Sequence, residues 1–195
     1  MAPEETAFAA AAEIDEVTFR RAQRGDEGAC RELVRRYERP VFALLGRMLG
    51  PAGRGALVED LAQETFLRLF RELEHLSHHG PARLSTWILT VATRLALDEV
   101  RRPGPQTEPL DRATDLAAPD RTDARADRRA LAVVLARAVA ALAPESRAVL
   151  LLREYHELRY EEIARALELD VGTVKSRLFR ARAALREALG EVDHA

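Results

Sequence analysis

The residues best suited to chemistry lie near the C-terminal end, in a helical pattern over 171–189. At 100° per residue, Val174, Leu178, Ala181 and Leu185 share one face and predict a stripe facing the core. The rest of the surface carries Thr173, Lys175, Ser176, Arg177, Phe179, Arg180 and Arg182. Guanidinium groups bind guanine edges and phosphates, and an aromatic ring can contact a thymine methyl group. The pattern therefore predicts a helix that reads DNA.

Each of these side chains has an expected role. Arg180 is predicted to read guanine and Phe179 to touch a thymine methyl group, while Lys175, Arg177 and Arg182 hold phosphates. Thr173 lies in the first helical turn, where backbone N–H groups without helical partners bind anions. The alternative is a solvated, arginine-rich terminal helix, against which an exposed phenylalanine among arginines argues.

A short helix over 160–167 and a tight turn at 168–170 precede this pattern. That order and spacing are typical of a helix-turn-helix, in which the second helix enters the major groove.

A second pattern lies over 57–74. Its apolar arc is opposed by a mixed face of Asp60, Gln63, Glu64 and Leu67. A leucine exposed among carboxylates and an amide indicates a docking face for a partner helix. An ordinary charged helix face explains the same residues equally well at this stage.

A third pattern lies over 85–101, where Thr90, Arg94, Asp98 and Arg101 share an outer face. Arg94 and Asp98 have the spacing of an intrahelical ion pair. The basic end formed by Arg101 and Arg102 can grip a phosphate backbone.

Composition and breaks predict an all-α fold of two small helical domains joined by a flexible linker. Hydrophobic residues make up 47% of the 195 residues and aromatics 5%, with Ala, Leu, Arg and Glu dominant. The prediction places a disordered acidic segment at 1–12, domains at 13–102 and 128–190, and a proline-rich linker at 103–127. The expected helices are 15–23, 26–48, 57–74, 85–101, 128–142, 144–155, 160–167 and 171–189.

Several functional classes are disfavoured. Cys30 is the single cysteine, so no internal disulfide or multi-cysteine metal site is possible. His75, His78 and His79 lie in a loop-like stretch without partner cysteines, and no metal, cofactor or catalytic arrangement is expected. No apolar run approaches the roughly 20 residues of a membrane span, and no signal peptide is visible, so a cytoplasmic protein without membrane insertion is expected.

Four segments together resemble the extracytoplasmic-function sigma factors of bacterial RNA polymerase. Asp60–Leu67 is similar to the family's D-x-x-Q-E-x-F-x motif, and Thr86–Arg102 to T-W-L…A-R-N-x-x-x-D-x-x-R-R. Glu161–Arg182 is similar to E-E-I-A…G-T-V-x-S-R-L-x-R-A-R, and Leu142–Arg147 to L-P-x-x-x-R.

The resemblance implies a sigma factor that binds core RNA polymerase, through its β and β′ subunits, and promoter DNA. The Asp60–Leu67 face would dock on the β′ clamp helices. Thr90, Arg94, Arg101 and Arg102 would serve the −10 element, and the helix after residue 170 the −35 element. An anti-sigma protein is an implied further partner. A conventional dimeric helix-turn-helix regulator and a helical adaptor without a DNA role are the rival interpretations.

Two departures from the family pattern bear on the predicted surfaces. Arg94 stands where the A-R-N stretch has asparagine, and Glu168 stands where the turn of the helix-turn-helix has glycine. Because glycine adopts left-handed backbone angles most readily, the turn is expected to use a different conformation here.

Overall fold

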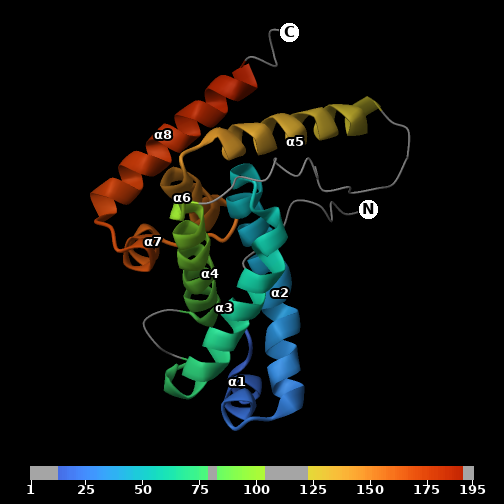
Figure 1. The fold of residues 1–195 in the computed structure, drawn as a ribbon, viewed down its shortest axis with the longest axis vertical. Helices are drawn as coiled ribbons and strands as arrows, with labels where there is room; N and C mark the ends of the chain where they lie inside the picture. The colour runs from blue at the N-terminus through green and yellow to red at the C-terminus, as the bar shows by residue number, and fades with distance from the viewer. Residues whose placement is uncertain (1–12, 79–82, 104–122, 191–195) are drawn as a thin grey trace.

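The computed structural model describes residues 13–78, 83–103 and 123–190, with only the backbone given for 123–130. Within these residues the fold is all-α, as predicted (Figure 1). The predicted segment 1–12 and most of the predicted linker lie outside the described residues. The N-terminal domain comprises α1 (Glu16–Gln23), α2 (Glu27–Leu49), α3 (Val58–Glu72) and α4 (Leu84–Arg101), with short 3₁₀ turns at Gly50–Ala52, Gly55–Leu57 and Leu73–His75. The C-terminal domain comprises α5 (Asp123–Ala141), α6 (Pro144–Glu154), α7 (Tyr160–Leu167) and α8 (Val171–Gly190).

The helix α2 is the spine of the N-terminal domain. Its N-cap is Asp26, whose carboxylate accepts a hydrogen bond of 2.8 Å from the backbone N–H of Ala29. Leu33, Val41 and Leu44 are fully buried along the face that packs against α3 and α4. This long apolar stripe fixes how α3 and α4, which carry two of the predicted surfaces, are placed beside each other (Figure 1).

The C-terminal domain is built around α6, which begins with Pro144 at a helical N-terminal position. Val149, Leu150 and Leu151 are buried on it, and α7 and α8 pack against them. The helix α5 begins at Asp123, earlier than the predicted start at 128, so residues 123–127 are helical where an extended linker was expected.

The turn between α7 and α8 corrects one prediction. Glu168 ends α7 at φ 55° and ψ 46°, the left-handed conformation that a glycine would take at this place. The turn therefore keeps the usual helix-ending geometry, and Glu168 adopts it at a steric cost that glycine would not carry. The expectation of a different conformation was wrong.

The two domains pack directly on each other. Helix α4 contacts α6 and α7, and the end of α2 contacts α6 (Figure 1). The buried guanidinium of Arg147 on α6 donates 3.0 Å to the carbonyl of Met48 in α2 and 3.1 Å to that of Val139 in α5. The sequence predicted two domains but gave no indication of this contact.

Candidate DNA and protein interfaces

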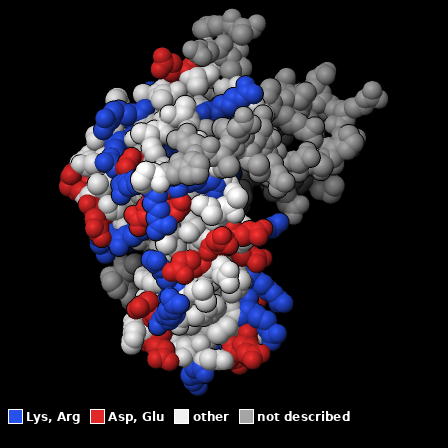
Figure 2. Space-filling view, in the orientation of Figure 1, with Lys and Arg blue, Asp and Glu red and all other residues white. Residues whose placement is uncertain are grey.

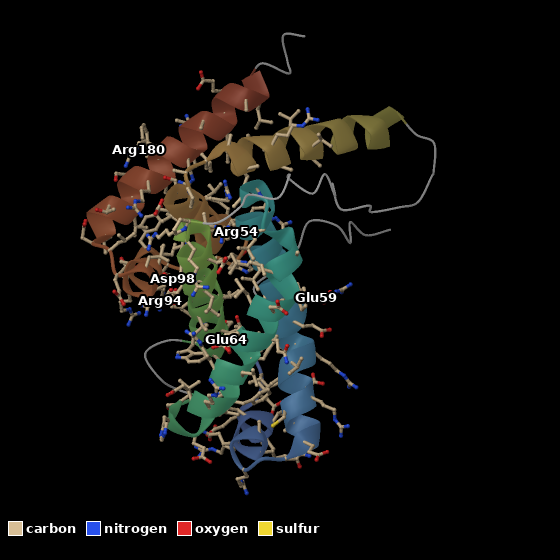
Figure 3. The ribbon with its side chains drawn as sticks, viewed as in Figure 1. Arg54, Glu59, Glu64, Arg94, Asp98 and Arg180 are labelled. Atoms are coloured by element: carbon tan, nitrogen blue, oxygen red, sulfur yellow. The ribbon has the colours of Figure 1, made fainter. Side chains whose placement is uncertain are left out.

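The predicted DNA-reading surface lies on α8, whose apolar stripe is buried as expected. Val174, Leu178 and Ala181 are at most 1% exposed and Leu185, the fourth residue of the predicted stripe, is half-buried, whereas Phe179 is 68% exposed. Lys175, Ser176, Arg180 and Arg182 are exposed, and Thr173 and Arg177 are half-buried. Figure 3 shows Arg180 on the outer side of α8, away from the body of the molecule. The helix thus presents a large aromatic ring among basic groups.

Four members of this surface already have hydrogen-bond partners within the chain. Ser176 donates through its hydroxyl to the Thr173 carbonyl at 3.0 Å, and Arg180 donates through Nε to the Ser176 carbonyl at 3.3 Å. Thr173 donates through its backbone N–H to Asp170, the N-cap of α8, at 2.7 Å. The expectation that this N–H is open to an anion was therefore wrong, because the Asp170 carboxylate occupies it. The Thr173 hydroxyl donates to the other oxygen of the same carboxylate at 2.5 Å, and these two hydrogen bonds, the hydroxyl's first, lower the pKa of Asp170 below its usual value. Arg182 forms an ion pair with Glu154 of α6 at 2.5 Å, which raises the pKa of its guanidinium.

The predicted docking face of α3 borders an open groove against α2. Gln63 and Leu67 line the groove, which has a volume of about 300 Å³. Its remaining lining residues are Val34, Glu38, Phe42, Glu59, Ala62, Phe66 and Phe70. Asp60 is exposed on the same helix, and Glu64 is half-buried and accepts a 2.7 Å hydrogen bond from Arg68. That hydrogen bond is the main reason why the pKa of Glu64 is lowered.

The groove has apolar walls and acidic edges. Phe42 and Leu67 are 41% and 43% exposed, which is unusual for side chains of this size. Acidic side chains gather across the middle of the face in Figure 2, close to where Figure 3 labels Glu59. Such a surface can take an amphipathic helix with basic flanks. Phe42 was missed from the sequence, although a phenylalanine between the charged positions 38–39 and the buried position 44 was a usable signal.

The residues predicted on the outer face of α4 are mostly engaged by the chain itself. Arg94 does not pair with Asp98; its Nε donates 2.7 Å to the carbonyl of Ala166, and its Nη2 lies 3.0 Å from the Glu168 carboxylate. Arg101 pairs with Glu145 of α6 at 3.1 Å.

The two remaining α4 candidates bond within the N-terminal domain. Arg102 pairs with Glu99 at 3.0 Å, and Glu99 also binds Arg54. The hydroxyl of Thr90 donates 2.7 Å to the carbonyl of Thr86. Trp87 packs half-buried at the edge of the core.

The histidines and the cysteine show ordinary structural contacts. His78 lies 2.7 Å from the Ile14 carbonyl, and its ring is tilted by 55° against that of Phe19 with the centroids 5.5 Å apart. His75 is exposed, and His79 lies outside the described residues. Cys30 is half-buried, and burial is the main cause of its raised thiol pKa. The described part of the chain contains no cluster of possible metal ligands. None of its helices is both long and apolar enough to cross a membrane.

Two family models match the chain, one within each of its two helical domains. The Sigma-70 region 2 model matches residues 33–104, and the Sigma-70 region 4 model matches residues 132–185.

Curated relatives match over nearly their whole length. The RNA polymerase sigma-H factor of Pseudomonas aeruginosa is 31% identical over 190 residues, which cover 91% of this chain and 94% of the relative. The ECF RNA polymerase sigma-E factor of Escherichia coli K12 is 32% identical over 181 residues, which cover 88% and 92%.

Two solved structures share the fold. CnrH in complex with the cytosolic domain of CnrY superimposes with a TM-score of 0.60 at 23% identity, covering 91% of this chain and 97% of CnrH. RpoE from Bartonella quintana, in complex with the anti-sigma factor NepR, gives a TM-score of 0.58 at 19% identity, covering 82% and 97%.

Proposed function

The chain belongs to the extracytoplasmic-function sigma factors, and from this premise we propose how its surfaces divide the work of promoter recognition. It is a promoter-recognition factor for transcription initiation and not an enzyme. We assign −35 reading to α8, polymerase docking to the groove between α2 and α3, and −10 engagement to α4. Its action on core RNA polymerase takes place in the cytoplasm.

The observation that carries the proposal is the exposed pair Phe179 and Arg180 on the second helix of a helix-turn-helix. The buried stripe of α8 fixes which face of the helix points outward. That face carries the Arg180 guanidinium, which can bind a guanine edge, next to the apolar ring of Phe179. Lys175 and Arg177 flank the pair and can position it through phosphate contacts. Arg182 can contribute only after it releases Glu154.

The −35 assignment is tested by run-off transcription with core RNA polymerase, with and without this chain, on a promoter library. Arg180→Ala should lower discrimination between matched and scrambled −35 sequences by about 1–3 kcal/mol. Arg186→Ala is the matched control, because Arg186 is also exposed and basic on α8 but lies nearly two turns beyond Arg180, toward the end of the helix. An equal loss on matched and scrambled sequences would show that Arg180 contacts only the backbone.

Polymerase docking follows from the shape of the groove. Its exposed Phe42 and Leu67 and its acidic edge suit a basic, amphipathic helical element such as the clamp of the β′ subunit. Leu67→Asp should weaken retention of core polymerase on the immobilised chain and spare −35 recognition. Val17→Asp is the control, since Val17 is 69% exposed on α1 and away from the groove. Unchanged retention by Leu67→Asp would refute this docking surface.

An anti-sigma protein is proposed as a further partner. The two similar solved structures described above are complexes, one with an anti-sigma factor and one with the cytosolic domain of CnrY. Apolar side chains on α5, among them Leu131 and Val133, are exposed and provide surface for such a partner.

A further inference from the structure

The outer face of α4 is closed by charged contacts from the chain's own C-terminal domain. Arg94 donates 2.7 Å to the carbonyl of Ala166 and 3.4 Å to that of Arg165, and it pairs with Glu168 at 3.0 Å. All three partners belong to the end of α7 or to the turn that follows it. Figure 3 shows Arg94 and Asp98 on the side of α4 that faces α7.

A second contact closes the end of the same helix. Arg101 pairs with Glu145 in the first turn of α6 at 3.1 Å. Burial acts to raise the pKa of Glu145, but the pKa is lowered overall by a hydrogen bond from its own backbone N–H, by hydrogen bonding to Arg101 and by the charges of Arg101 and Arg177. The pairs Arg94–Glu168 and Arg101–Glu145, which we call the interdomain latch, therefore tie both halves of the α4 outer face to the C-terminal domain.

The latch lies at the rim of a packed interface that also contains the guanidinium groups of Arg147 and Arg47. His156, buried in the loop after α6, lines a small enclosed space with Tyr37, Ser85 and Ile88 of the N-terminal domain. Arg47 of α2 lies over the ring of Tyr155, 4.6 Å from its centroid. The closed arrangement is thus a packed contact with an electrostatic rim.

We propose that the interdomain latch makes the isolated chain self-closing, so that its −10 face becomes available only when the two domains separate. The inference rests on the proposed role of α4 in −10 engagement. Arg94 and Arg101 cannot contact promoter DNA while they bind α7 and α6, and the same closure fixes the helix-turn-helix against α4. Polymerase and DNA would compete with the latch for these arginines.

The exposure of the paired groups sets how strong the latch is. Arg94 and Glu168 are 45% and 78% exposed, and Arg101 and Glu145 are 57% and 32% exposed. Ion pairs so open to water and salt are weak, so the latch biases the chain toward the closed form and does not lock it. A competing partner can therefore overcome this preference for the closed form.

The test measures domain separation in the full-length chain without DNA or polymerase. Nitroxide labels at Glu72→Cys on α3 and Glu187→Cys on α8, in a Cys30→Ser background, report the distance by double electron–electron resonance. Glu168→Arg places two positive charges together and should raise the ratio of open to closed molecules about three- to tenfold. Arg94→Glu should act in the same direction, and the double variant R94E/E168R should recover part of the closure.

Glu161→Arg is the matched control, because Glu161 is exposed on α7 and carries the same charge change outside the latch. It should leave the ratio unchanged, and high salt should open the wild type and not the Glu168→Arg chain. An open-to-closed ratio for Glu168→Arg within about twofold of the wild type would overturn the proposal. So would a double variant as open as the single variants, because it would show that the charges do not act on each other.

A second measurement separates this proposal from the proposed function. If polymerase binds the open form, Glu168→Arg should speed holoenzyme assembly by the same factor as it raises the open fraction. An unchanged rate despite an increased open fraction would overturn the gating role. Absence of any holoenzyme would instead refute the sigma-factor surfaces, and the resonance measurement would still decide whether the latch closes the chain.

Discussion

The buried histidine between the two domains makes stability depend on pH within a window that the structure defines. His156 is 6% exposed, and burial, followed by the charge of Arg47, lowers the pKa of its imidazole from 6.5 to about 4. The folded chain therefore keeps His156 neutral at pH values where the unfolded chain protonates it.

The direction and size of the effect follow from this difference in pKa. Because the unfolded chain binds the additional proton, the stabilisation is complete above pH 6.5 and is lost as the pH falls toward 4. With pKa values of 6.5 unfolded and about 4 folded, lowering the pH from about 7.5 to about 5 removes about 2 kcal/mol from the free energy of unfolding. The carboxylates with lowered pKa, including Asp170, have ordinary pKa values at or below 4.5 and therefore titrate mostly below this window.

Urea unfolding followed by circular dichroism at the two pH values measures this loss. In the His156→Gln chain the side chain at position 156 is neutral at both pH values and can still form hydrogen bonds. The stability of this chain therefore no longer depends on protonation at position 156, whereas all other groups titrate as before. We expect the wild type to lose about 2 kcal/mol more than His156→Gln between the two conditions. Equal losses in the two chains would show that His156 is not held neutral in the folded protein, and would refute the reasoning.

Three further predictions concern helix ends and the domain contact. Asp170→Ala removes the N-cap of α8 and should cost about 1 kcal/mol in urea unfolding, whereas Asp98→Ala, an exposed position within α4, should not act through N-capping. Arg147→Met leaves the buried carbonyls of Met48 and Val139 without this donor and should cost about 3 kcal/mol or more; a loss under about 1 kcal/mol would mean that water replaces the guanidinium. Glu168→Gly should raise thermal stability by about 0.5–1 kcal/mol because it relieves the left-handed backbone, yet it should increase domain opening; a less stable variant would contradict the strain argument.

Much of the fold could be predicted from the sequence because its determinants are local. The stripe of Val174, Leu178 and Ala181 repeats with the helical period, so the wheel identified the buried face of α8 correctly. The same reasoning correctly predicted that Phe179 and Arg180 are exposed to solvent. The Thr173 prediction failed because the wheel considers only side chains within the helix and ignores Asp170, one position before it.

The domain contact could not be predicted in this way. Arg94 and Glu168 lie in different domains, and both have side chains that suit an exposed position. Helical spacing paired Arg94 with Asp98, the nearest acid on its own helix, and nothing local disfavours that choice. Only the packing of α4 on α7 brings the helix-ending carbonyls of Ala166 and Arg165 within reach, where an arginine is preferred to a shorter side chain.

Two of the departures from the family pattern, Arg94 and Glu168, are the partners of one contact. Glu168 holds a left-handed backbone that costs more for glutamate than for glycine, so the turn itself gives no reason for the carboxylate. Arg94 likewise binds the end of α7 and does not pair with Asp98 on its own helix. Each residue is unfavourable or unexplained within its own domain and becomes favourable only when the domains meet. That dependence implies that the pair acts on the equilibrium between closed and open chains, and that changing either residue alone should shift it in the same direction.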